Sequence, residues 1–498
     1  MIDILLENQI VRLQSCESLH GRTKIMVNTD KVTASNVAEI LESTLPIDAC
    51  NVSEINYLYD VYRGIMDIRF KTKTVRPQNN NKVVVNIPNK IVTFKSSFLL
   101  SSPIQYIAAT GEKEISDKVA ELNSLMSSED KESKDKECVD WMHICGVAPR
   151  MVLPDPDFDR DGSPVAIYSL DPREAFVIYS SRLGKKPIAG VLKQYDDEGE
   201  IFYHVYTPNG VMKVSNDGSV FTLVEYDFGR VPIVEYPNNE ARLGAFEIVL
   251  SPINQINTLE SARVDNVVDF VNAFDVFQNC EITGDKYSSL AEGGKYINIK
   301  SVAGAEAKVY RISSEISQQG VQTELNALYE YIDEITGMPN RNGGSSTSDT
   351  GQATIFRDGW HDAESRACDS EKLFIRSEKE ILKLILKMYR DKGVLDLNPA
   401  DVKVQFTRKN LTDIQSKAQV LCELLNNPKV HPRIAYECAA LLPDIEASYR
   451  LGMEWYEEQM KAAEMSLEEE LENERAVHND GQSYSSPAEE SGPEISAG

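Results

Sequence analysis

The chain has 498 residues, and its 52 Lys and Arg against 78 Asp and Glu give a formal net charge of −26. With 42% hydrophobic and 26% charged residues it has the composition of a globular protein, and its length corresponds to roughly two to four domains. Wholesale disorder and collagen-like repetition are therefore excluded. A chain this acidic repels a phosphate backbone at long range, which argues against a conventional high-affinity nucleic-acid binder with a basic face.

No apolar run approaches the roughly 18 to 20 residues of a membrane span, and the N-terminus carries acidic residues where a signal peptide has a basic start. We therefore expect a soluble protein that stays in the compartment where it is made. The eight cysteines form no CxxC pair, which indicates reduced thiols that act mainly as small buried apolar groups.

The first 145 residues are predicted to be mainly helical, because apolar residues recur at helical spacing over residues 2–13, 37–45, 91–100 and 115–125. Between these helices, residues 83–87 (VVVNI) are typical of a strand. The charged, mixed-sign run at 127–137 is expected to be a solvated loop or a solvated helix face.

A β-rich segment follows between Pro149 and Pro237. Short runs rich in Val, Ile, Tyr and Phe predict strands at 165–168, 175–179, 189–195, 201–207, 211–214 and 220–226. Turn signals separate them at DDEG, PNG and NDG, and this spacing predicts an antiparallel meander.

Beyond Gly244 the pattern returns to helix. One side of the predicted helix is apolar from Val249 to Phe274, and the other side carries short, polar, mildly acidic residues, namely Asn254, Asn257, Ser261, Asp265, Asp269 and Asn272. Two starts are open: Ser251 and Pro252 act as N-cap and first residue, or Pro252 kinks a helix that begins near Phe246.

A compact segment with two predicted strands, 296–300 and 307–312, leads into a second helix that ends at Gly337. A Gly/Ser-rich loop without apolar residues follows at 340–351. The next helix keeps its phase until Gly393, and roughly 40 residues correspond to a length of about 60 Å. Such a helix spans a structure and does not fill a small core.

The C-terminal part is predicted as a short strand at 402–406 and helices at 412–425, at 433–442 and from about 444. From Glu454 onward there are 13 Asp and Glu and 2 Lys and Arg, which places −11 of the net charge in this segment. The last residues have nothing to bury and are predicted to be disordered.

Sequence motifs for catalysis are lacking: there is no GxxxxGK[ST], GxSxG or HExxH. Cys138, His143 and Cys145 crowd together, but without a fourth ligand they indicate a helix in a core and not a metal site. Asp157, Asp159, Asp161 and Gly162 match only the first half of a calcium loop, which favours an acidic turn. We therefore predict no catalytic residue, no metal and no cofactor.

The segment GRVPIVEYPNNEARLGAFEIVL, with Tyr236-Pro237-Asn238-Asn239, Gly244 and Phe246-Glu247, resembles the portal proteins of long-tailed bacteriophages. The helix after it, with Asn257, Ser261 and Asn266, and the segment SSTSDTGQATIFRDGW are similar to that family as well. The order of the parts also fits, and the resemblance covers roughly residues 54–453.

The resemblance implies an α+β portal-type fold with a helical and β-rich wing, two stem helices, a small α/β clip, a long spanning helix and a helical crown. The implied boundaries are wing 1–243, first stem helix 244–274, clip 275–316, second stem helix 317–337, tunnel loop 338–351, long helix and returning wing strand 352–411, crown 412–465, and an acidic, disordered tail 466–498.

The family also implies a function: a ring, usually of twelve subunits, at one vertex of the capsid, assembled in the host cytoplasm, through which double-stranded DNA is packaged and ejected. Its implied partners are the large terminase motor, head-completion or adaptor proteins, and the major capsid and scaffolding proteins, with no membrane. The implied DNA-facing loop is Asn340, Arg341, Asn342, Gly343, Gly344, Ser345, Ser346, Thr347, Ser348 and Asp349.

A channel through which DNA slides should not grip phosphates, because each neutralised phosphate adds a salt-dependent release cost. The polar face of the first stem helix suits such a wall, although a merely solvated face is an equally good interpretation. Two other functions remain open: a metal-dependent phage nuclease or hydrolase, and a capsid or scaffold protein with no role in DNA passage.

Overall fold

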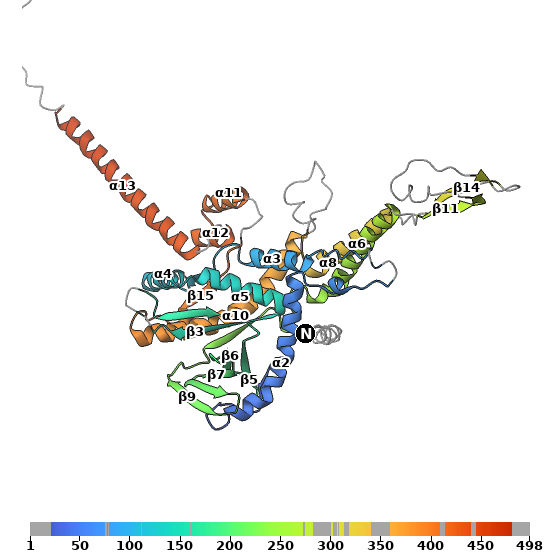
Figure 1. Cartoon of the computed structure of the whole chain (residues 1–498). Coiled ribbons are helices and arrows are strands. Elements are labelled where there is room, and N and C mark those ends of the chain that lie inside the picture. Colours follow the sequence, from blue (N-terminus) through green and yellow to red (C-terminus); the bar gives the residue numbers. More distant parts are fainter. Residues whose placement is uncertain are drawn as a thin grey trace, which may run out of the picture. The chain divides into compact units, whose positions relative to one another are not determined.

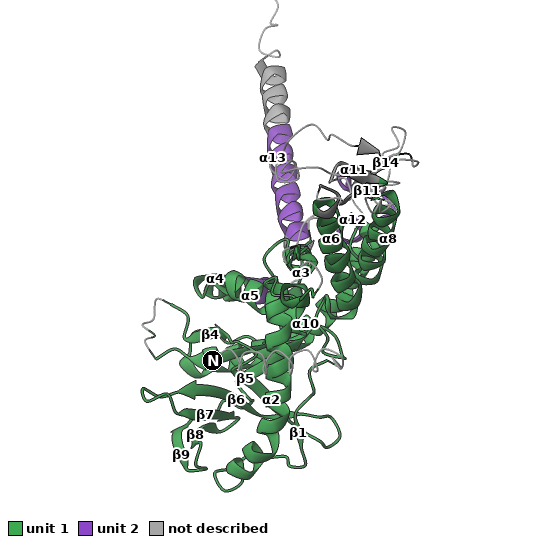
Figure 2. Cartoon of the chain, turned by 45° about the vertical axis from the view of Figure 1, so that its right-hand side comes forward, with its two compact units in different colours: residues 1–106, 118–411 green, residues 107–117, 412–498 purple. Residues whose placement is uncertain are grey.

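The computed structural model describes residues 21–74, 77, 79–110, 112–156, 158, 162–271, 274–281, 300–301, 306, 308–312, 318–339, 359–408, 414–439 and 445–480. The chain is mixed α and β (Figure 1), and it forms two compact units (Figure 2). Unit 1 comprises residues 1–106 and 118–411, and unit 2 comprises residues 107–117 and 412–498.

The helices of the N-terminal part are α2 (Val37–Tyr62), α3 (Ile87–Leu99), α4 (Lys113–Ser128) and α5 (Lys131–Cys145), with the 3-10 turn η1 (Asp67–Phe70) after α2. The predicted helices at 37–45, 91–100 and 115–125 are confirmed, and the one at 2–13 lies outside the described residues. The prediction of a strand at 83–87 is wrong, because α3 begins at Ile87 and residues 81–86 belong to no sheet.

Two sheets follow. A six-stranded sheet has the order β1-β5-β6-β7-β8-β9, and a three-stranded antiparallel sheet has the order β10-β3-β4. Their bounds are β1 Met26–Val27, β3 Val147–Pro154, β4 Val165–Ser169, β5 Ala175–Ser180, β6 Pro187–Tyr195, β7 Ile201–Thr207, β8 Gly210–Ser215, β9 Val220–Glu225 and β10 Ile233–Pro237; a further short strand, β2, spans Gln105–Ala108. The predicted meander is confirmed for β5 to β9, which pair antiparallel in chain order.

The remaining elements of unit 1 are η2 (Glu247–Val249), α6 (Leu250–Val271), β11 (Phe274–Gln278), β12 (Cys280–Glu281), β13 (Lys300–Ser301), β14 (Lys308–Ile312), α8 (Gln318–Thr336), α10 (Trp360–Lys392), η3 (Pro399–Asp401) and β15 (Val402–Gln405). β11 pairs antiparallel with β14, and β12 with β13. The long helix has 33 residues, about 50 Å. It begins directly after Gly359, which has a φ of 79°, and the part of the predicted helix before Gly359 lies outside the described residues.

Unit 2 contains α11 (Ile414–Leu425), α12 (Pro432–Ala439) and α13 (Ile445–Asp480). The three predicted C-terminal helices are confirmed. The prediction of a disordered tail from residue 466 is wrong up to Asp480, because α13 continues through 36 residues. Its Glu, Ala, Met and Leu residues are good helix formers, so the segment needs no buried face to be helical. Residues 481–498 lie outside the described part.

Two apolar clusters stabilise unit 1. The first half of α2 covers the six-stranded sheet, where Val37 and Leu41 pack with Ile178, Val191 and Val205. A second cluster joins α2, α3, α6 and α8 through residues such as Leu58, Ile91, Ile253 and Leu325. The close approach of the two sheets needs Gly190 on β6, where a Cβ would lie 2.6 Å from Ile233 of β10.

A network of buried charges, which we call the Glu378 cluster, connects α10 to the three-stranded sheet. Glu378 is fully buried, lies 3.0 Å from Lys131 and 3.3 Å from Arg150, and accepts hydrogen bonds of 2.6 Å from the hydroxyls of Tyr106 and Tyr236.

Asp135 completes the Glu378 cluster at 2.6 Å from Lys131 and 2.7 Å from Arg150. The prediction of a solvated loop or a solvated helix face at 127–137 is therefore wrong for part of this charged run. The run contributes Lys131 and Asp135 to the interior, where oppositely charged groups compensate each other.

Candidate functional site: the α6 and α8 helix pair

α6 begins in a tight turn formed by the residues that carry the family resemblance. The amides of Asn238 and Asn239 both donate to the Leu243 carbonyl at 2.9 Å. Gly244 has no room for a side chain, since a Cβ would lie 2.5 Å from the Ile144 carbonyl oxygen. Phe246, which follows, is fully buried. These residues therefore fix the direction in which α6 leaves the sheet.

An ion pair anchors this start. Glu247 accepts the Gly244 N–H at 2.8 Å and lies 2.6 Å from the buried Arg22 guanidinium. Of the two helix starts left open by the sequence, the structure favours the earlier one, because η2 begins at Glu247 and passes directly into α6. Pro252 lies in the first turn of α6, where its missing N–H breaks no intrahelical hydrogen bond.

The polar face of α6 lies against an extended segment of the same chain. The backbone N–H groups of Asn81, Val83 and Val85 donate to Asp265 Oδ1 (2.8 Å), Ser261 Oγ (2.9 Å) and Asn257 Oδ1 (2.8 Å). Two residues of extended chain advance about 6.7 Å and four residues of helix about 6 Å, so the two periods match. We call this arrangement the α6 ladder.

The α6 ladder revises part of the predicted channel face. Asn257, Ser261 and Asp265 are at most 4% exposed and are occupied by backbone donors, so they do not line a channel. Asn254 is partly exposed and donates to Asp67 at 3.2 Å. Asp269 belongs to the last turn of α6, and Asn272 lies outside the described residues.

Asp265 carries the one charge of the α6 ladder. Burial by itself would raise the pKa of Asp265, but the N–H and side-chain amide of Asn81 and the Lys73 ammonium, 3.3 Å away, outweigh burial and lower it. The carboxylate therefore stays ionised and binds the extended segment tightly.

The α6 and α8 helices lie side by side (Figure 1) and share an apolar seam. Ile253 and Ile256 of α6 and Leu325 and Ile332 of α8 are all at most 1% exposed. The apolar stripe of α6 continues beyond this seam in Val264, Val267 and Val268, which are 37%, 54% and 37% exposed. In the described part of this chain the second half of the stripe has no cover.

The predicted tunnel loop, Asn340 to Asp349, lies outside the described residues, but its two anchors are described. α8 ends at Thr336, and the φ of 68° at Gly337, which follows, confirms the predicted C-terminal glycine. Arg366 of α10 donates to the Ile335 carbonyl at 2.9 Å and so satisfies the end of α8. A Cβ on Gly359 would lie 3.8 Å from Pro339 Cα, so the described residues on either side of 340–358 lie close together.

The candidate metal ligands show no metal site. Cys138, His143 and Cys145 all lie on α5 and are buried, and His143 Nδ1 lies 3.0 Å from Ser96 Oγ. Burial and the nearby Lys95 and Lys136 charges lower the pKa of His143 to about 3, so the ring is neutral. Asp157, Asp159 and Asp161 lie outside the described residues.

Across the described ranges no group of three His, Cys, Asp or Glu is arranged to hold a metal ion. Among the helices described, none combines the length and apolarity that crossing a bilayer requires.

Comparison with known proteins agrees with the resemblance read from the sequence. The model of the family described as "Phage portal protein, SPP1 Gp6-like" matches residues 43–470, which is most of the chain. A search of curated proteins gives no match. Because the match extends through β3 to β10, the α6 and α8 pair, α10 and most of α13, the chain belongs to the phage portal protein family.

Proposed function

We propose that this protein assembles into a ring at one capsid vertex and serves as the conduit for double-stranded DNA during packaging and ejection, with no catalytic step of its own. The observation that carries the proposal is the match to the portal family across residues 43–470. The ring contains about twelve copies, as the resemblance implies, and it assembles in the host cytoplasm before it becomes part of the virion.

The uncovered stripe on α6 supports assembly. Exposed apolar residues that continue a buried stripe indicate a surface that another molecule covers. In a ring, Val264, Val267 and Val268 of each copy pack against the neighbouring copy. Tyr331 and Ile335, towards the other end of the helix pair, are exposed as well.

The convergence of Pro339 and Gly359 supports a tunnel loop. The ends of α8 and α10 that flank this segment lie close together, as the two ends of a loop do. We assign residues 340–349 to the channel, with Arg341 as the single basic contact to the DNA backbone. Asp269, in the last turn of α6, and Asn272, which follows the helix in the sequence, are the stem residues that we retain as candidates for the channel wall.

The charge of the chain suits this role. A wall that neutralised many phosphates would hold DNA with a strongly salt-dependent affinity, whereas an acidic wall lets the duplex slide. We assign the insert between α6 and α8, residues 275–316, to the large terminase and then to the head-completion proteins, and the outer surface to the major capsid and scaffolding proteins.

Negative-stain microscopy of the purified full-length protein tests the proposal. We expect end-on rings with a central hole wide enough for a duplex. A protein that sediments as a monomer over a wide concentration range, with and without scaffolding protein, would contradict it. Metal-dependent cleavage of DNA that one Asp→Ala change abolishes would favour a nuclease instead.

A matched pair of variants locates the contact between copies. Val267→Glu places a charge in the uncovered stripe and should reduce the fraction of ring by at least about tenfold, since a buried unpaired charge is strongly unfavourable. Gln255→Glu adds the same charge at an exposed position away from the stripe on the same helix and should leave the rings intact.

A further inference from the structure

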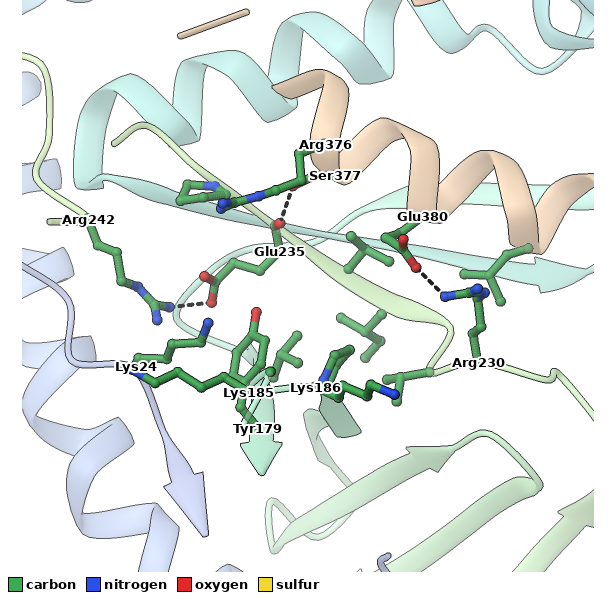
Figure 3. A pocket seen from close by; sticks show the side chains of 18 of the residues that line it. Lys24, Tyr179, Lys185, Lys186, Arg230, Glu235, Arg242, Arg376, Ser377 and Glu380 are labelled. Atoms are coloured by element: carbon green, nitrogen blue, oxygen red, sulfur yellow. Dashed lines mark hydrogen bonds and ion pairs between the residues drawn. The ribbon is translucent and has the colours of Figure 1, made fainter. Parts of the chain in front are cut away.

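Unit 1 contains a cavity of about 1000 Å³ between β5, β10 and α10, away from the α6 and α8 pair. Figure 3 shows Lys24, Lys185 and Tyr179 on one side, opposite Glu235 and the α10 residues Arg376 and Glu380. Such a volume is large enough for several side chains of a peptide.

The cavity is positively charged although the chain is strongly acidic. Three carboxylates line it, Glu235, Glu240 and Glu380, against six cations, Lys24, Lys185, Lys186, Arg230, Arg242 and Arg376. The three arginines each have an ion pair: Arg242 with Glu235, Arg230 with Glu380 at 2.5 Å, and Arg376 with Glu240 at 2.8 Å.

The three lysines form no ion pair within the described part of the chain. The Lys24 ammonium lies 3.9 Å from the centroid of the Tyr179 ring, which offers a π face and no charge. Burial lowers the pKa of Lys24; Glu235 opposes this shift, and Arg242, Arg376 and Lys185 add to it. The potential inside the cavity is therefore positive.

One wall of the cavity depends on an unfavourable backbone conformation. Arg242 has a φ of 60°, in the left-handed region, and its carbonyl accepts the Arg22 N–H at 3.1 Å. The Nε and Nη1 atoms of Arg242 are buried and have no hydrogen-bond acceptor among the described residues. A guanidinium held in this way presents donors that an incoming anion could satisfy.

The six-stranded sheet, which contains β5, also carries an acidic turn whose charge is complementary to that of the cavity. The β6–β7 turn contains Asp196, Asp197, Glu198 and Glu200, all exposed. Asp196 holds the turn by accepting the N–H groups of Glu198 and Glu200 at 3.0 and 2.8 Å. The other three carboxylates form no ion pair within the described ranges.

The two features lie at opposite ends of one strand. β6 has nine residues, which correspond to about 30 Å, with Lys186 directly before it and Asp196 directly after it. The β6–β7 turn cannot reach the cavity at the other end of its own strand, but it can reach the cavity of a second copy of the chain. Contacts of this head-to-tail kind close into a ring when the rotation between adjacent copies divides a full turn.

We infer that the cavity is the acceptor for the acidic β6–β7 turn of a neighbouring copy, whose carboxylates pair with Lys24, Lys185 and Lys186. The inference rests on the proposed ring. It adds a defined contact between the β-rich parts of adjacent copies to the contact proposed between their α6 helices. Opposite charges across this contact also favour one orientation of the two copies.

A disulfide crosslink tests the inference. We place Lys185→Cys and Asp197→Cys in one chain in which every native cysteine except the buried Cys138 and Cys145 is replaced by serine. On oxidation, the double variant should give a covalent ladder on non-reducing gels, at least tenfold stronger than either single variant gives. In a mixture of the two single variants, crosslinking should stop at covalent dimers, because each copy then carries only one introduced cysteine.

Charge reversal provides a second, independent readout. Lys185→Glu with Lys186→Glu, and separately Asp197→Lys with Glu198→Lys, should each lower the yield of rings by several fold, and the four changes together should restore it. Lys403→Glu, an exposed position on β15, is the matched control and should have no effect.

The outcomes separate this inference from the proposed function. Rings in the microscope without crosslinks between copies, or without rescue by the fourfold variant, would overturn the inference and leave the conduit in place; the cavity would then have another acidic partner or none. Absence of rings from the wild-type protein would overturn both.

Discussion

The Glu378 cluster and the α6 ladder are two buried polar arrangements that solve different problems. In the Glu378 cluster, charged groups compensate charged groups: two cations, two carboxylates and two tyrosine hydroxyls meet in the interior. In the α6 ladder, helix side chains compensate the backbone of a segment that has no strand partner.

The comparison shows why polar helix faces in this protein do not imply solvent. Lys131 and Asp135 of α5 and Ser261 and Asp265 of α6 all have the spacing of a solvated face. Each of them is buried because another part of the chain supplies its partner. The Glu378 cluster depends on charge. Removing one of its charged groups should therefore lower the free energy of unfolding more than removing one hydrogen bond of the α6 ladder.

The largest effect is expected for Glu378→Ala. It leaves Arg150 and Lys131 buried with Asp135 alone, and breaking a buried ion network in this way costs about 3–5 kcal/mol. Urea titration followed by Trp141 and Trp360 fluorescence, in a Trp455→Phe background, measures the loss of stability of unit 1. Glu378→Gln, whose amide oxygen can still accept from one of the two tyrosine hydroxyls, should lose less.

Glu380→Ala is the matched control for this variant. Glu380 lies two residues further along α10, is partly exposed, and pairs with Arg230 and Lys383. Such pairs contribute about 1 kcal/mol or less. An equal loss for the two variants would contradict the distinction between buried and surface charge.

The second expected effect concerns a titratable group that is buried without a countercharge, His143. Its pKa is about 3 in the folded chain against 6.5 in the unfolded chain. Between these values the unfolded chain binds the proton and the folded chain does not, so stability falls as the pH drops below 6.5.

At pH 4.5 the loss from His143 should be about 2–3 kcal/mol relative to pH 7.5. His143→Gln removes the titration and should flatten this part of the pH profile, measured by the same urea titration. The exposed His361→Gln should leave the slope unchanged. A wild-type slope in the His143→Gln variant would assign the acid sensitivity to other groups.

Much of the fold was predictable because its signals are local. The periods of α6 and α8 and the turns between β5 and β9 are properties of short windows, and the structure confirms them. Residues 83–87 were mispredicted because their β-branched composition is that of a strand, whereas Val83 and Val85 donate to α6 side chains about 170 residues away.

The candidate site was less predictable than the fold, because the contacts that define it join residues far apart in the sequence. The spacing of Asn257, Ser261 and Asp265 correctly indicates one helix face, but no local signal says what covers it. The sequence does contain a hint: three consecutive polar residues, Asn79, Asn80 and Asn81, precede the apolar run, and Asn79 and Asn81 both donate to Asp265. Side chains that bond across such distances become visible only in the structure.

The third effect tests the α6 ladder. Ser261→Ala leaves the Val83 N–H without its acceptor, and an unsatisfied buried donor costs about 1–3 kcal/mol. We expect faster hydrogen exchange at Val83 and its neighbours, measured by mass spectrometry on the peptide that covers 79–86. Thr258→Ala, at an exposed position on α6, should leave this exchange unchanged. Unchanged exchange in Ser261→Ala would mean that the bond from Val83 to Ser261 does not help to hold the segment.

The smallest effect is expected for Arg263→Ala, which asks whether the α6 and α8 pair depends on polar contacts at all. Arg263 donates to Gln318 at 3.2 Å and to Gln322 at 3.1 Å, but both contacts are exposed, so their loss should cost less than about 1 kcal/mol. Leu325→Ala, in the buried seam, should cost about 2–5 kcal/mol in the same urea titration. If the two losses were equal, surface hydrogen bonds would hold the pair. If they differ as expected, the apolar seam fixes the helix pair, and buried polar groups elsewhere fix what lies against it.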